Sequence, residues 1–171
     1  MTRVHLLLKA INDFLEKCFS ILAMLLMSMI ILIVLGGAAT RFFTGSGYNI
    51  VLELPPMLMP WLIFPMAAVL VRNGGHITVD FLPEKLSGKS KKILDITVYF
   101  ICFCAAVAFC LAGYEATNLF ILVGQRTEME WSFPIWYIYL SFPIGFLFMA
   151  STTMEKLLES FLKETESGKL G

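Results

Sequence analysis

The sequence contains little charge, and this shortage decides its broad class. Only 15% of its 171 residues are Asp, Glu, Lys or Arg, whereas a soluble domain has about a quarter. Hydrophobic residues make up 58%, and they come in long uninterrupted runs. The mean hydropathy is +0.78. These features predict an integral membrane protein. Because the net charge is zero, nothing indicates a nucleic-acid partner.

Groups that carry chemistry are also scarce. The two histidines, His5 and His76, cannot supply paired mid-membrane ligands for a haem, and no metal-ligand spacing is present. The four cysteines all lie in apolar runs, where Cys behaves as a small hydrophobe. The sequence has no nucleophile elbow, phosphate-binding glycine loop or HExxH motif. We therefore predict a protein that is not an enzyme and has no cofactor or metal.

Four apolar runs are long enough to cross a hydrocarbon core, which takes about 20 helical residues. We place the spans at residues 18–40, 50–72, 93–123 and 131–150. Four prolines in the second run predict a kinked helix packed against protein on one side. Alternatively, Pro55 and Pro56 mark where that helix begins. In the fourth run Pro143 predicts a kink.

Amphipathic segments flank the spans. In residues 1–17 apolar side chains recur at i, i+3, i+4 and i+7 between polar ones. With no soluble core available, we expect this segment to lie in the membrane interface or against a partner. The alternative is that it extends the first span. Residues 151–171 predict a second amphipathic helix with a polar tip. The predicted fold is all-α, with four transmembrane helices and amphipathic interfacial helices at the N-terminus and after the last span.

Orientation follows from the distribution of Lys and Arg. The N-terminal segment, the three loops and the tail hold 3, 1, 5, 1 and 3 of them, when Arg72 is counted with the second loop, 73–92. Positive charge favours the cytoplasmic side of a membrane. We therefore predict that both termini and this loop are cytoplasmic.

The candidate functional residues lie near the ends of the spans. Arg72, Gly75, His76 and Asp80 follow one another where the second span leaves the membrane, and we predict a structural hinge or a partner interface there. His76 and Asp80 can share a helix face, or Asp80 can cap a helix that begins at Phe81. Arg72 has no carboxylate at helical spacing before Asp80. Its charge is therefore expected to be free for Asp80, lipid phosphate or a partner subunit.

Three other charged residues are candidate polar contacts, namely Arg41, Glu53 and Glu115. Glu53 and Glu115 can contact a partner or an ion path, or they can simply lie within reach of headgroups and water. No mid-span carboxylate pairs with a basic residue at helical spacing. The chain is thus expected to offer packing faces and little intramembrane chemistry.

The stretch Arg72-x-Gly-Gly-His76-Ile77-Thr78-Val79-Asp80, between the second run and a basic loop, resembles the DctQ-type small membrane subunit of TRAP transporters. Weaker matches extend the resemblance over about residues 18–160, and they are Arg41-Phe42, Glu53, Trp61 and Pro143-Ile144-Gly145. The family often has a tryptophan just before the glutamate and an arginine shortly after it. Here Leu52 precedes Glu53 and two prolines follow.

The resemblance implies a scaffold in the bacterial inner membrane. Its partners would be a large sodium-coupled, elevator-type membrane subunit (DctM-type), a periplasmic substrate-binding protein (DctP-type) and membrane lipids. Family substrates are mostly organic acids such as C4-dicarboxylates and sialic acids. Two alternatives remain open, a self-sufficient small four-helix transporter and the membrane anchor of a redox complex.

Overall fold

The computed structural model describes residues 3–73, 89–128 and 132–167. These residues form the helices α1 (Arg3–Thr44), α2 (Ile50–Arg72), α4 (Lys89–Val123), α5 (Trp136–Tyr139) and α6 (Ser141–Ser167). In the described chain, β structure is limited to one isolated bridge between Arg126 and Pro134. Four candidate spans are long and apolar enough to cross a membrane, the last running from α5 into α6. The prediction of an all-α, four-span membrane protein is confirmed.

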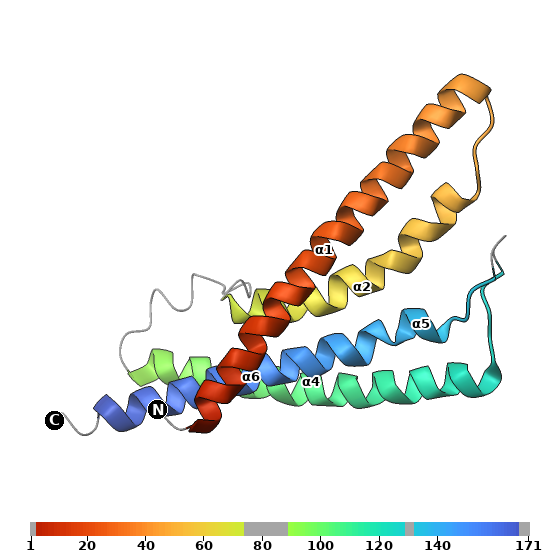
Figure 1. Cartoon of the computed structure of the whole chain (residues 1–171). Helices are drawn as coiled ribbons and strands as arrows, with labels where there is room; N and C mark the ends of the chain where they lie inside the picture. The colour runs from red at the N-terminus through yellow and green to blue at the C-terminus, as the bar shows by residue number, and fades with distance from the viewer. Residues whose placement is uncertain (1–2, 74–88, 129–131, 168–171) are drawn as a thin grey trace.

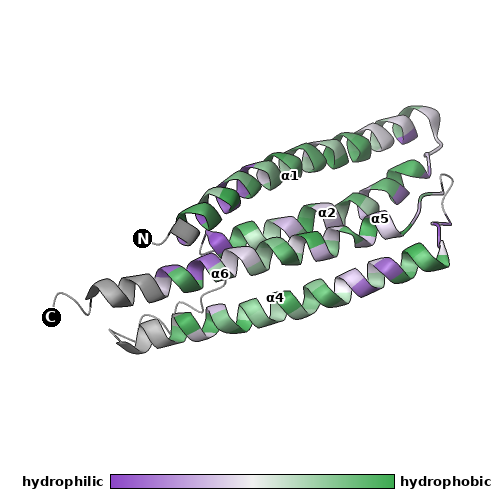
Figure 2. Cartoon of the chain, turned by 60° about the horizontal axis from the view of Figure 1, so that its bottom comes forward, coloured by the Kyte–Doolittle hydropathy of each residue, from purple (hydrophilic) through white to green (hydrophobic). Residues whose placement is uncertain are grey.

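The α2 and α6 helices form the middle of the molecule, with α1 on one side and α4 on the other (Figures 1 and 2). Helix α6 packs against both α2 and α4, and α2 also packs against α1. The beginning of α1 and the end of α6 lie at the same end of the molecule (Figure 1). Figure 2 shows apolar residues along most of each long helix and polar residues gathered towards the helix ends.

Both amphipathic segments are helical, as predicted, but each is continuous with its neighbouring span. Helix α1 runs unbroken for 42 residues, because no proline or glycine interrupts it before Gly36. At 1.5 Å per residue it is about 63 Å long, twice the hydrocarbon thickness of about 30 Å. Helix α6 likewise carries the last span directly into the tail. For the backbone, the alternative in which residues 1–17 extend the first span is therefore the better description.

Helix α2 begins at Ile50 and holds all four prolines in its interior. The alternative that Pro55 and Pro56 mark its start is therefore wrong. Each proline removes one backbone hydrogen bond from the helix, and packing against both α1 and α6 compensates for this loss. Trp61 adds a bond between α2 and α5, because its indole Nε1 donates to the carbonyl oxygen of Tyr137 at 3.0 Å.

The fourth span is interrupted at Leu140, between α5 and α6. Pro143 causes the interruption, since it has no N–H to donate to the carbonyl of Tyr139 and its ring crowds that carbonyl. The bonds on either side persist, with Leu140 N donating to Trp136 O and Ile144 N donating to Leu140 O. The structure thus shows an interruption of this span close to Pro143, where the sequence predicts a kink.

Glycines bring three of the helices close together. A Cβ on Gly145 would lie 2.6 Å from the backbone carbon of Phe64, so α6 touches the α2 main chain at this position. A Cβ on Gly113 would collide with the ring of Phe142, which brings α4 against α6. Towards the Arg72 end of α2, Phe148 packs in the core with Ala68 and Val69, and Leu15 and Phe19 of α1 lie against them.

Candidate functional site

An ion-pair network centred on Arg72 joins three helices. Arg72 is the last residue of α2, and its side chain is 7% exposed. Its Nη1 donates to Oε2 of Glu16 at 2.5 Å, and its Nη2 donates to Oδ1 of Asp13 and to Oε1 of Glu155 at 3.4 Å. Asp13 and Glu16 belong to α1 and Glu155 to α6. A planar guanidinium with several donors suits this arrangement better than an ammonium.

Asn12 connects α1 to α6 beside this network. It is fully buried, and its Nδ2 donates to Oε2 of Glu155 at 2.7 Å and to the carbonyl oxygen of Ser151. The Ser151 hydroxyl donates in return to Oδ1 of Asn12 at 2.7 Å. On the other side of Arg72, Asn73 donates to Oε1 of Glu16 at 3.2 Å. The polar groups of this network thus satisfy one another, as burial requires.

The network contains three carboxylates and one guanidinium. Asp13 lies before the span predicted at residues 18–40. The hydrogen bond from Arg72 lowers the pKa of the Asp13 carboxyl below its ordinary value, with smaller help from Lys9 and Lys17. Arg72 also stands at the C-terminus of α2, where the helix dipole favours positive charge. The network holds the helices together, and its groups are not arranged to make or break covalent bonds.

The sequence-predicted site residues fall in different places. Gly75, His76 and Asp80 lie outside the described residues, and Arg72 lies in the network above. The expectation that the charge of Arg72 is free is wrong, because carboxylates of α1 and α6 hold it.

The remaining candidates are not brought together. Arg41 and Glu115 are exposed and Glu53 is half-buried. Within the described residues, no side-chain hydrogen bond or ion pair joins any of these three to another residue. The same part of the chain also shows no group of three or more His, Cys, Asp or Glu arranged to hold a metal ion.

Sequence reasoning missed Asn12, Asp13, Glu16 and Glu155 as members of one site. They were visible only as the polar faces of two amphipathic segments. A usable signal was nevertheless present, because the charge counts place both termini and the end of the second span on one side of the membrane. Three charged segments confined to one side have few partners other than one another.

The N-terminal part of α1 turns two of its polar residues inwards and several apolar residues outwards. His5 and Asn12 are buried, whereas Leu7, Ile11 and Phe14 are each more than half exposed. A soluble protein would turn these faces the other way. These exposed apolar side chains are therefore available to lipid or to another protein, and the placement of this segment in the membrane interface or against a partner stays a prediction.

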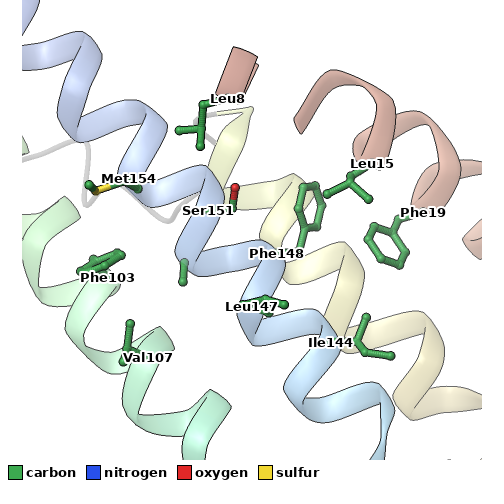
Figure 3. Close-up of a pocket in the computed structure, with 11 residues that line it drawn as sticks. Leu8, Leu15, Phe19, Phe103, Val107, Ile144, Leu147, Phe148, Ser151 and Met154 are labelled. Carbon is green, nitrogen blue, oxygen red and sulfur yellow. The ribbon is translucent and has the colours of Figure 1, made fainter. Parts of the chain in front are cut away.

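An apolar groove of about 540 Å³ lies between α1 and α4, with α6 as its floor (Figure 3). Leu15 and Phe19 line it from α1, and Phe103 and Val107 line it from α4. Figure 3 shows these side chains facing each other across Leu147 and Ile144 of α6. The chain thus leaves an open apolar space between its two outer helices.

The spans and the ion pairs together define the structural class of this protein. The protein is a multi-pass helical membrane protein in which ion pairs of Arg72 join α2 to α1 and α6. Residues 29–163 match the family model described as "Tripartite ATP-independent periplasmic transporters, DctQ component". The chain belongs to this family of TRAP transporter subunits, which are transporter components and not enzymes.

Two relatives illustrate the range of the family. The chain is 30% identical over 142 residues to the C4-dicarboxylate TRAP transporter small permease protein DctQ of Pseudomonas aeruginosa, an alignment that covers 78% of this chain and 67% of that protein. It is 26% identical over 144 residues to the uncharacterized protein y4mM of Sinorhizobium fredii. That alignment also covers 78% of this chain but only a quarter (25%) of the relative.

Proposed function

We propose that this chain is the small membrane subunit of a sodium-coupled TRAP transporter that imports an organic acid. It binds the large, elevator-type DctM-type subunit and steadies it, while a periplasmic DctP-type protein delivers the substrate. It lies in the bacterial inner (cytoplasmic) membrane with both termini in the cytoplasm, because the basic residues concentrate on that side.

The placement of the ion pairs carries this proposal. Arg72 ion-pairs with three carboxylates where α2 ends, and the fourth described ion pair, Lys156–Glu159, lies in the second half of α6, beyond Glu155. A substrate or ion path normally needs polar groups near mid-membrane. The described spans instead present apolar surfaces, many of them exposed. A rigid frame with open apolar faces suits a scaffold that another membrane protein completes.

The proposed substrate class rests only on the similarity of this chain to TRAP transporter relatives. The Pseudomonas relative is named for a C4-dicarboxylate, so this class of substrate, with sialic acids as the second choice, is the first to test. A subunit without a substrate path of its own has no side chains that select among such acids.

Reconstitution in liposomes tests the scaffold function. Vesicles with an inward sodium gradient receive this chain, the large subunit or both, together with the binding protein and a labelled C4-dicarboxylate or sialic acid. We expect uptake only when both membrane subunits are present, and only with sodium. Uptake by this chain alone would overturn the proposal in favour of a self-sufficient transporter. Uptake by the large subunit alone at the full rate would remove the need for a scaffold.

A further inference from the structure

The outward face of α1 carries an apolar stripe along almost its whole length. Its positions alternate in steps of four and three residues from Leu7 to Phe42, and ten of the eleven are apolar. All eleven are exposed, and the exception, Ser28, turns its hydroxyl onto the Met24 carbonyl of its own helix. We call this set the α1 stripe: Leu7, Ile11, Phe14, Cys18, Ile21, Leu25, Ser28, Leu32, Leu35, Ala39 and Phe42.

A repeat of 3.5 residues is the pattern by which one helix packs along another. On a helix with 3.6 residues per turn such a stripe drifts by about 20° per heptad, so the partner must wind around it with a left-handed twist. Between Cys18 and Thr40 most residues are apolar, so the repeat in this stretch hardly distinguishes the stripe from the other faces of the helix. It is informative before Cys18, where Lys9, Asp13 and Lys17 stand beside the stripe and its own members remain apolar.

At the average tilt of a membrane helix, the α1 stripe is longer than the bilayer is thick. From Leu7 to Phe42 it extends about 52 Å along the helix at 1.5 Å per residue. At the average tilt of about 20° for membrane helices it still spans about 49 Å across the membrane. A whole bilayer with its headgroups is roughly 40–45 Å thick, and its hydrocarbon core about 30 Å. At this tilt, apolar residues at one or both ends of the stripe reach water unless another protein covers them.

A second copy of this chain is a poor occupant. Copies in one membrane share one orientation, so two α1 helices would pair in parallel. In a parallel pair the flanking residue Lys17 would lie opposite Leu22 of the other copy, five residues further along. Charged pairs at such flanking positions are what normally select a partner, and this arrangement provides none.

We infer that the α1 stripe is the surface on which a long apolar helix of the large membrane subunit docks. This inference rests on the proposed function, and it specifies which face of this chain binds the large subunit. Two further observations support a different, larger partner. The groove beside the stripe, lined by Leu15 and Phe19, stays open in this chain. In the Sinorhizobium relative the matching region is only 25% of a much longer protein, so there the same module is joined to further polypeptide.

Site-specific photocrosslinking tests this assignment in the complete complex. Benzoylphenylalanine is placed at Ile11, Leu25 or Leu35 on the stripe, and at Leu111 on the exposed face of α4 as the matched control. All four side chains are exposed, so the substitutions leave the internal packing intact. We expect a product with the mass of this chain plus the large subunit from the three stripe positions and little from Leu111. The double variant Ile11→Ser/Phe14→Ser should lower co-purification of the large subunit by at least about tenfold.

The other outcomes are distinct. Products with the mass of two copies of this chain would overturn the inference in favour of a homodimer. If the two subunits co-purify but only Leu111 crosslinks, or neither face does, the docking face lies elsewhere and the proposed function stands. If wild-type protein does not co-purify with the large subunit at all, the proposed function itself fails.

Discussion

Arg72 and Glu155 form an ion pair across 83 positions of sequence, with 3.4 Å between Nη2 and Oε1. Both side chains are less than a tenth exposed, and the pair ties the end of α2 to α6. Asp13 and Glu16 add α1 to the same guanidinium. Buried charges of this kind favour one arrangement of helices, because any other arrangement leaves a charge without a partner.

Replacing Arg72 by alanine should destabilise the protein strongly. The change leaves Glu155 buried without its cation, and breaking a buried pair by removing one partner costs about 3–5 kcal/mol. We expect a clear fall in the midpoint of thermal unfolding in detergent. Arg72→Lys should recover only part of it, because an ammonium cannot bridge carboxylates from two helices as a guanidinium does.

Lys17→Ala is the matched control for that experiment, since Lys17 is an exposed cation of α1 and exposed pairs contribute at most about 1 kcal/mol. The double variant Arg72→Met/Glu155→Leu should be more stable than Arg72→Ala, because it removes the unpaired charge together with its partner. An unchanged unfolding midpoint for Arg72→Ala would contradict a structural role for the network.

Gly145→Ala should destabilise the α2–α6 contact. The new methyl group would lie 2.6 Å from the Phe64 backbone, and overpacking of this kind typically costs about 1–3 kcal/mol. Gly36→Ala is the control, because nothing lies within 4 Å of the methyl group there. Alanine favours a helix over glycine by about 0.5–1 kcal/mol, so Gly36→Ala should be neutral or stabilising. Thermal unfolding of the two variants in one detergent checks the contrast, and equal effects would contradict it.

The orientation of the chain is testable by cysteine labelling. In a background without the four native cysteines, a cysteine at Lys89 should react with a membrane-impermeant thiol reagent only after the cells are opened. A cysteine at Ser46, in the loop at the opposite end of the first span, should react in intact cells. This contrast follows from the five basic residues of the second loop, Arg72 included. Labelling at Lys89 in intact cells would reverse the topology.

The hinge residues beyond Arg72 should affect assembly and not ion binding. We predict that Asp80→Ala weakens co-purification with the large subunit and lowers uptake, and that His76→Ala does so more mildly. The sodium concentration for half-maximal uptake should stay nearly unchanged, because the proposed function assigns the sodium sites to the large subunit. Lys85→Ala, in the same loop, serves as the control. A strong shift in sodium dependence with normal assembly would instead place the hinge within the transport mechanism.

Much of the fold could be predicted because the membrane spans of a helical protein appear in its sequence as long apolar runs. Apolar runs set the four spans, and the bounds of the second, 50–72, coincide with α2. Pro143 indicated the interruption that the structure places at Leu140. The extent of the helices was harder to predict. No local signal ends the first helix between residues 17 and 18, so the amphipathic segment and the span form one helix.

The sequence by itself determined the class, the number of spans and the scarcity of intramembrane chemistry, since hydropathy and composition act locally along the chain. The tertiary structure alone decided the partners of Arg72. Its three carboxylates lie 56 to 83 positions away, and no helical spacing connects such residues. The structure also decided that α1 turns Asn12 inwards and Phe14 outwards. The face that a helix buries depends on which neighbours can satisfy its polar groups, and those neighbours meet only when the helices pack.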